Sequence, residues 1–149
     1  MAEKVINMEY NKYTVAVGLI RFSEGKAYLS QRVNTKNFVG KWQFVGGKLE
    51  KGEHPVDGGA REVEEETGLN IGPKRLSYFM PILEDPTTDV CHAFLVELTN
   101  KEIPIRTERH KMTDWILVTF EEALKLDLMP GLRTIIGKLK TQFDRLEKV

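Results

Sequence analysis

The sequence predicts an α/β fold in which a sheet lies between two helical layers. Strand-length runs of apolar residues precede and follow a charge-rich segment with helical end signals, and an amphipathic helical pattern closes the chain. At 149 residues, 41% hydrophobic and 30% charged, the chain can bury roughly two-thirds of its unfolded surface. We therefore expect one domain, residues 1–149, without internal repeats or long linkers.

Six stretches have the length and composition of strands. They are apolar or rich in β-branched residues, and they cover residues 13–22, 27–32, 42–45, 75–83, 90–98 and 114–118. The first two stretches are joined by residues 23–26, which contain Gly25 and are typical of a hairpin turn. Residues 84–89 are rich in turn-forming types and separate the fourth predicted strand from the fifth. Helices are expected to cover this sheet.

Two helical stretches follow the last predicted strand. Residues 120–126 indicate a short helix, and a longer amphipathic helix is predicted to begin at Pro130. Its apolar residues recur at helical spacing and should face the core: Leu132, Ile135, Ile136 and Leu139.

The central helix is framed by its own end signals at residues 55–67. Pro55 suits the first helical position because its missing N–H costs nothing there, and Gly68 suits a left-handed C-terminal cap. At about 100° per residue, the positions within this helix separate into two arcs. The arc expected to face a core contains Val56, Ala60, Val63 and Thr67. The arc on the opposite side carries three carboxylates: Glu62, Glu65 and Glu66.

The carboxylate arc is unfavourable for a helix with a purely structural role. Glu62 repels Glu65 and Glu66, each pair costing roughly 0.2–0.5 kcal/mol in an exposed helix. Gly58 and Gly59 inside the helix cost about 1 kcal/mol each relative to Ala. We expect Gly58, one turn before Glu62, to leave room for a metal or a phosphate. Ligation by oxygen alone favours a hard cation such as Mg²⁺ or Mn²⁺, whereas a solvated charged face is the plainer alternative.

The segment 47–69 resembles the signature of the Nudix hydrolases. That signature is a Gly, five residues, a Glu, seven residues, Arg-Glu, a bulky apolar residue, any residue, Glu-Glu, any residue, Gly and a bulky apolar residue. The chain supplies Gly47, Glu53, Arg61, Glu62, Val63, Glu65, Glu66, Gly68 and Leu69 at those positions. Such a coincidence arises by chance on the order of once in a billion start positions. Residues 40–46 also resemble the MutT-like branch, although Val45 replaces its usual Pro.

The resemblance implies a fold, a metal site and a reaction. The fold is an α/β/α sandwich with a mixed central sheet, and the reaction is metal-dependent hydrolysis of a pyrophosphate bond. The implied metal ligands are Glu62, Glu65, Glu66 and the backbone carbonyl of Gly46. Arg61 is expected to orient glutamates through a salt bridge that includes Glu53. Either Glu62 or Glu108, in the loop before the last strand, is the candidate general base.

The substrate class is less strongly indicated by the residues. Gly46, Gly47 and Arg32 are expected to bind substrate, with Arg32 contacting phosphates. The leading hypothesis is a nucleoside or deoxynucleoside triphosphate, including an oxidised one, cleaved to monophosphate and pyrophosphate. The alternative is a nucleoside diphosphate linked to another moiety, such as ADP-ribose, an NDP-sugar or a dinucleoside polyphosphate. Phe38, Phe79 and Trp115 could stack on a base, but aromatic residues in a chain of this size are more often core residues, so they are not assigned to the site.

Composition limits the other function classes. Lys+Arg and Asp+Glu balance at 22 each, so neither long nucleic acid nor a membrane is an expected partner. A single cysteine and a polar start indicate a cytoplasmic protein without a signal peptide. Glu53 and His54 replace the Lys and Ser or Thr of a P-loop, and the scattered histidines are not assigned to a site. A non-enzymatic nucleotide-binding module and a homodimer remain open.

Overall fold

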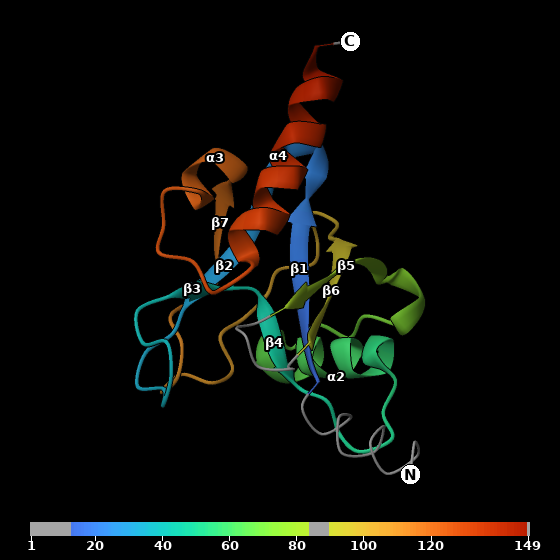
Figure 1. Cartoon of the computed structure of the whole chain (residues 1–149), viewed down its shortest axis with the longest axis vertical. Coiled ribbons are helices and arrows are strands. Elements are labelled where there is room, and N and C mark those ends of the chain that lie inside the picture. The colour runs from blue at the N-terminus through green and yellow to red at the C-terminus, as the bar shows by residue number, and fades with distance from the viewer. Residues whose placement is uncertain (1–12, 84–89, 149) are drawn as a thin grey trace.

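The computed structural model describes residues 13–83 and 90–148. Within them a mixed β-sheet has helices on both faces (Figure 1). The strands are β1 (Thr14–Arg21), β2 (Lys26–Gln31), β3 (Trp42–Gln43), β4 (Val45–Lys48), β5 (Ser77–Leu83), β6 (Val90–Glu97) and β7 (Ile116–Thr119). The helices are α2 (Pro55–Thr67), α3 (Phe120–Ala123) and α4 (Leu132–Glu147), with 3-10 turns η1 (Phe22–Glu24) and η2 (Pro73–Arg75). The predicted turn-rich stretch 84–89 and the polar start of the chain lie outside the described residues.

Strand β1 is the centre of the sheet. It pairs in parallel with β6, antiparallel with β4 along its first half, and antiparallel with β2 at its last two residues. Farther out, β5 pairs with β6, while β3 and β7 pair with β2, all antiparallel. The sheet is therefore mixed, as the resemblance implied.

The two faces of the sheet bury different cores. Val15 and Val17 of β1 belong to a core cluster that also contains Val63 of α2, whereas Ile20 belongs to a second cluster with Ile136 of α4. Side chains along a strand point alternately to opposite faces, so α2 and α4 must cover opposite sides. The predicted helix–sheet–helix arrangement is confirmed.

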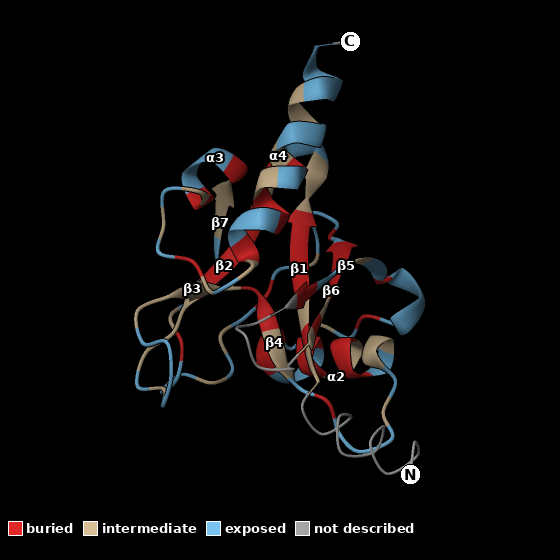
Figure 2. Ribbon diagram, viewed as in Figure 1, coloured by how far each residue is buried: buried red, intermediate tan, exposed pale blue. Residues whose placement is uncertain are grey.

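Burial is concentrated where the helices meet the sheet. Figure 2 shows buried residues along the central strands and in the first turns of α4, while the last turns of α4 are exposed. The predicted core residues of this helix are all buried: Leu132, Ile135, Ile136 and Leu139. Among residues 13–83 and 90–148, no helix is both long enough and apolar enough to cross a membrane.

Most predicted strand bounds differ from the structure by one or two residues, and three differences change an element more substantially. The strand predicted at 42–45 is two strands separated by Phe44, because β3 pairs with β2 whereas β4 pairs with β1. The long helix begins at Leu132 instead of Pro130, since Gly131 has φ 81° and ends the preceding loop. The helix predicted at 120–126 stops at Ala123, and Leu126 donates its N–H to the Ala123 carbonyl in a tight turn, at 3.0 Å.

A bidentate ion pair between Arg75 and Glu102 joins η2 to the loop after β6. Arg75 donates Nη1 to Oε2 of Glu102 at 2.6 Å and Nη2 to Oε1 at 2.8 Å, and the Thr99 N–H donates to Oε1 at 2.9 Å. These bonds, with the Arg75 charge, lower the pKa of Glu102 to about 2. Bidentate pairs of this kind hold loops better than single contacts.

Glu102→Gln is expected to lower the free energy of unfolding by about 1 kcal/mol at pH 7, because both side chains are partly exposed to solvent screening. The folded pKa lies below the ordinary value of 4.5. The carboxylate therefore stabilises the fold above that value, and the contribution is lost as the pH falls toward about 2. Urea unfolding of both proteins should show a difference at pH 7 that shrinks to about half or less at pH 3. Glu147→Gln, at the exposed end of α4, is the control, and an equal difference at both pH values would contradict this account.

Candidate active site

Helix α2 begins and ends where the sequence predicted. Pro55 occupies the first turn, and Gly68 adopts φ 76° and donates its N–H to the Glu64 carbonyl at 2.9 Å. The Thr107 hydroxyl donates to the Glu65 carbonyl at 2.6 Å, and Trp115 Nε1 donates to the Glu66 carbonyl at 3.2 Å. The loop before β7 is thereby attached to the end of α2.

Helix α2 buries more than the predicted core arc. Val63 and Thr67 are buried as predicted, but Glu62 and Glu66 are buried too, with 9% and 5% of their surfaces exposed. Only Glu65 among the three carboxylates is exposed, with 55% of its side chain accessible. Two carboxylates of the arc, Glu62 and Glu66, are therefore buried in the protein, and the third, Glu65, faces solvent.

Glycines explain why α2 turns its carboxylates inward. A Cβ at Gly47 of β4 would lie 2.5 Å from Cδ of Glu62, so only a strand without a side chain there admits this carboxylate. Gly58 has a different role from the one expected. A Cβ at Gly58 would meet Leu49 and would lie 2.9 Å from Oε1 of Glu53, so these side chains fill the space predicted for a metal or a phosphate.

Arg61 connects the acidic residues of the motif. It donates Nε and Nη2 to the two carboxylate oxygens of Glu53 at 2.9 and 3.0 Å, and Nη1 to Glu62 at 3.0 Å. Nη1 also donates to Oε2 of Glu65 at 3.2 Å, and Nη2 donates to the Lys48 carbonyl at 3.1 Å. These bonds with Arg61 lower the pKa of Glu53. The predicted contact between Arg61 and Glu53 is present, and Arg61 connects α2 to the last residue of β4 and to the loop that follows it.

Glu62 and Glu66 form a buried carboxyl pair. The two carboxyl groups interact directly, so a hydrogen bond between them forms only while one of them is protonated, and the Gly46 N–H donates to Oε2 of Glu66 at 3.3 Å. Burial, followed by the bond to Glu62 and its charge, raises the pKa of Glu66 far above its ordinary value. Burial also raises the pKa of Glu62, although Arg61 opposes that shift. Both carboxylates can be ionised together only if positive charge replaces the proton.

The donor chemistry of this pair fits a hard divalent cation. Carboxylate oxygens are the ligands that Mg²⁺ and Mn²⁺ prefer, and a metal competes with protons for them. No three Asp, Glu, His or Cys side chains of the described residues form a ready-made metal cluster. Glu65 is turned toward Arg61, so Glu62 and Glu66 are the two predicted ligands that already lie together.

The structure brings Glu108 to the same place. Its negative charge contributes to the raised pKa of Glu66, and both side chains line one cavity of about 370 Å³. The nearest cation is Lys111, with Nζ 3.7 Å from Oε2 of Glu108. Glu108 therefore lies near Glu66, and its carboxylate oxygens can accept further hydrogen bonds.

A second cavity, of about 270 Å³, lies beside the first and is lined by all four residues of β4. It is lined mainly by apolar residues from the β-strands and from the start of α4, among them Phe44, Ile82, Met129, Leu132 and Ile135. Arg32, Gln43 and Gly46 line both cavities. An apolar cavity thus adjoins a polar cavity that is lined by the carboxylates of Glu66 and Glu108.

Arg32 is held at the junction of the two cavities. It donates Nη1 to Oε1 of Gln43 at 3.0 Å and Nε to the Asn37 carbonyl at 3.1 Å. Gln43 in turn donates Nε2 to the hydroxyl of Ser30, which is fully buried, at 3.3 Å. Arg32 therefore lies where it could contact a bound substrate, as its predicted role requires. Its neighbour Gln43 is a residue that the sequence did not single out.

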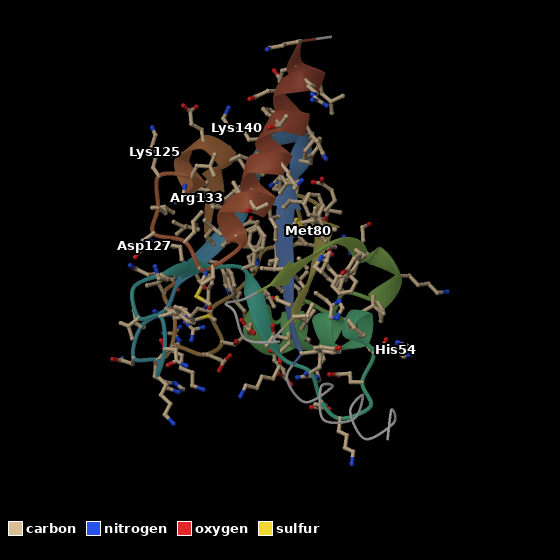
Figure 3. All side chains as sticks on the ribbon, viewed as in Figure 1. His54, Met80, Lys125, Asp127, Arg133 and Lys140 are labelled. Carbon is tan, nitrogen blue, oxygen red and sulfur yellow. The ribbon has the colours of Figure 1, made fainter. Side chains whose placement is uncertain are left out.

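The aromatic and histidine residues that were not assigned to the site lie in different parts of the structure. Phe38 lines the apolar cavity with 45% of its surface exposed and adopts φ 59°, which is unusual for a bulky residue. Trp115 is a core residue and Phe79 packs against the core. His54, before α2, points to solvent in Figure 3. Leaving the histidines outside the site agrees with the residues that line the two cavities.

Comparison with known families gives the class of protein. A model of the NUDIX domain matches residues 12–139. The chain belongs to the Nudix family.

Similar solved structures share this fold. One, from a study of MutT from Aliivibrio salmonicida and Vibrio cholerae, has a TM-score of 0.71 at 21% identity and covers 87% of this chain and 97% of the other. A MutT protein from Methanosarcina mazei has a TM-score of 0.63 at 25% identity, covering 92% and 95%. The predicted α/β sandwich of the MutT type is confirmed.

Curated relatives match over shorter stretches. The 8-oxo-dGTP diphosphatase of Haemophilus influenzae is 44% identical over 55 residues, which is 37% of this chain and 40% of the relative. That of Escherichia coli is 35% identical over 68 residues, 46% and 51% of the two chains. The ADP-ribose pyrophosphatase of Bacillus subtilis is 37% identical over 87 residues, 56% and 46%. The chain spans about half of the length of these curated relatives.

Proposed function

We propose that the protein is a metal-dependent pyrophosphohydrolase that cleaves a nucleoside or deoxynucleoside triphosphate to the monophosphate and pyrophosphate. The observation that carries this proposal is the buried pair Glu62–Glu66, of which Glu66 lines the polar cavity that shares Arg32, Gln43 and Gly46 with the apolar one. Three curated relatives are 8-oxo-dGTP diphosphatases, which supports a triphosphate and includes an oxidised one. The single Nudix domain, residues 1–149, is proposed to act as one unit.

Mg²⁺ is the proposed cofactor, with Mn²⁺ as a substitute. Nudix hydrolases generally need divalent metals, and the proposed ligands are Glu62, Glu65, Glu66 and the Gly46 carbonyl. When bound, a divalent cation would neutralise phosphate charge and lower the pKa of a coordinated water. Glu65 must turn from Arg61 to join the other ligands, which its exposure permits.

The remaining residues of the motif have positioning roles in this proposal. Arg61 holds Glu62 on the side that faces β4 and is itself held by both oxygens of Glu53. This arrangement limits the rotamers that Glu62 can adopt, so its oxygens stay aimed at the proposed metal position. Glu53 acts only through Arg61.

We place Glu108 first among the two candidate general bases. Glu62 accepts a hydrogen bond from Arg61 and is also a proposed metal ligand, so both of these roles compete with proton transfer from water. Glu108 lies on the wall of the cavity with one cation 3.7 Å away and can accept a proton from an attacking water. The proton then leaves to solvent, because 38% of the Glu108 side chain is accessible.

The two cavities accommodate the two parts of a nucleotide. The base and sugar are proposed to occupy the apolar cavity over Phe44, and the phosphates to cross Gly46 and Gly47 into the polar cavity. Arg32 lies at the crossing and is proposed to contact a phosphate. The backbone of these glycines lets phosphates approach closely, since no side chain intervenes.

The second candidate function is hydrolysis of a nucleoside diphosphate linked to another moiety. The similarity to an ADP-ribose pyrophosphatase over 87 residues favours it specifically. A nucleotide-binding module without catalysis is the weakest alternative, because every carboxylate of the motif is present.

A reducing cytoplasm is proposed as the compartment of the protein, with a homodimer left open.

The assay that tests the proposal reports products from a panel of nucleotides with Mg²⁺. The panel contains the common and oxidised triphosphates, ADP-ribose, a dinucleoside polyphosphate and a 5′-triphosphorylated RNA oligonucleotide. We expect pyrophosphate plus a monophosphate from at least one free triphosphate, and no turnover in EDTA. Two monophosphate-bearing products from ADP-ribose alone would replace the leading function with the second one, and rates unchanged in EDTA would contradict metal dependence.

A further inference from the structure

The polar cavity carries positive as well as negative charge. Lys36, Lys111 and Arg32 line it together with Glu66 and Glu108. Both lysines are exposed. Neither belongs to the Nudix signature.

Backbone bonds hold the two lysines on the same rim. The Val33 N–H donates to the Lys111 carbonyl at 2.9 Å, and Asn34 Nδ2 donates to the His110 carbonyl at 3.2 Å. Arg32 and Met112 form an antiparallel bridge beside them. Two loops that are far apart in sequence are therefore joined side by side.

The turn after β2 brings Lys36 to this rim. Asn34 adopts φ 51°, a left-handed conformation that Asn tolerates better than most residues, and the chain reverses there. The Thr35 hydroxyl donates to the Asn37 carbonyl at 2.9 Å and closes the turn that carries Lys36. The lysine lies on an ordered turn with its own hydrogen bonds.

Charge indicates what this rim would bind. A terminal phosphate has its second pKa near 6, so near pH 8 it carries about −2, against about −1 for each bridging phosphate. A nucleoside triphosphate therefore carries about −4, and a diphosphate that joins two moieties about −2. A metal at Glu62 and Glu66 and a contact from Arg32 would meet the first two phosphates. The third phosphate needs further cations to balance its charge. Lys36 and Lys111 lie on the rim of the same cavity.

Resting on the proposed function, we propose that Lys36 and Lys111 bind the terminal phosphate and make the site select triphosphates over diphosphates. Lys111 has a weak partner in Glu108, with 3.7 Å between the charged atoms, and can exchange it for phosphate. That exchange also frees the Glu108 carboxylate.

Isothermal titration calorimetry with unreactive ligands tests this inference. The ligands are the α,β-methylene analogues of GTP and of a GDP-sugar, both with Mg²⁺; they share a base, and only the first has a terminal phosphate. The proteins are the wild type, Lys36→Ala, Lys111→Ala, the double variant and a Lys36→Arg, Lys111→Arg variant. Lys125→Ala, on the exposed surface beside α3, is the matched control (Figure 3).

We expect the double Ala variant to lose at least about tenfold in affinity for the GTP analogue and less than about twofold for the GDP-sugar analogue. The Arg variant and Lys125→Ala should bind like the wild type. Equal losses for both ligands, no loss at all, or a wild type that binds the GDP-sugar analogue as tightly as the GTP analogue would overturn the inference. Since these ligands need no cleavage, failure of the proposed function would be seen separately, in the product assay.

Discussion

Replacing Glu66 by Gln is expected to lower kcat by at least about 1,000-fold while making the metal-free protein more stable. The variant loses a charged ligand of the proposed metal. It keeps an oxygen that can accept the Gly46 N–H, so the packing between α2 and β4 should survive. A loss of activity together with a gain of stability is the signature of a residue retained for function.

The stability gain follows from the titration of the buried pair. The pKa of Glu66 is raised from its ordinary value of 4.5 in the folded protein. Its contribution to stability is therefore complete below that value and declines as the pH rises toward the folded pKa. Gln does not titrate, so in EDTA the variant should exceed the wild type by about 2 kcal/mol at pH 8 and by less at pH 6.

Urea unfolding in EDTA at both pH values, with kcat measured in Mg²⁺, tests this pair of effects. Glu64→Gln, an exposed substitution on the same helix, is the control and should leave both quantities near the wild-type values. A Glu66→Gln variant that keeps more than about a tenth of the wild-type kcat, or that is less stable at pH 8, contradicts the proposed role.

Gly47→Ala is expected to lower kcat by about 100-fold with the fold intact. The new Cβ would lie 2.5 Å from Cδ of Glu62, which forces this carboxylate away from β4 and from Glu66. Because Arg61 bonds to Glu62, the displacement should extend to Arg61 as well. The far-ultraviolet circular dichroism spectrum should not change.

Gly72→Ala is the matched control for this glycine. A Cβ at Gly72 meets nothing within 4 Å, so activity should remain near that of the wild type. A crystal structure of Gly47→Ala should show the Glu62 side chain in a new rotamer. If Gly47→Ala were as active as Gly72→Ala, the close contact between β4 and Glu62 would have no catalytic importance.

The features that the sequence predicted well depend on local signals. The bounds of α2 follow from Pro55 and Gly68, whose backbone preferences act wherever the helix lies in the fold. The contact of Arg61 with Glu53 follows from the motif, and Glu108 follows from its place in the loop before β7. The apolar face of α4 follows from helical spacing alone.

The features that the sequence did not predict depend on partners distant along the chain. Helical periodicity ranks residues within α2, but the burial of Glu62 and Glu66 is decided by the absence of side chains on β4. Gln43 was overlooked because its partners, Arg32 and Ser30, come from β2 and the loop after it. No spacing rule connects residues that only sheet pairing brings together.

Calorimetric titration of the wild type with Mg²⁺, in buffers of different ionisation enthalpy at pH 7, measures how many protons leave as the metal binds. If Glu62 and Glu66 share a proton that a divalent cation replaces, about one proton should be released per metal bound. Glu66→Gln should show neither the binding nor the release. Mg²⁺ binding to the wild type without proton release, or equal binding to the variant, would contradict the assignment of this buried pair as the metal site.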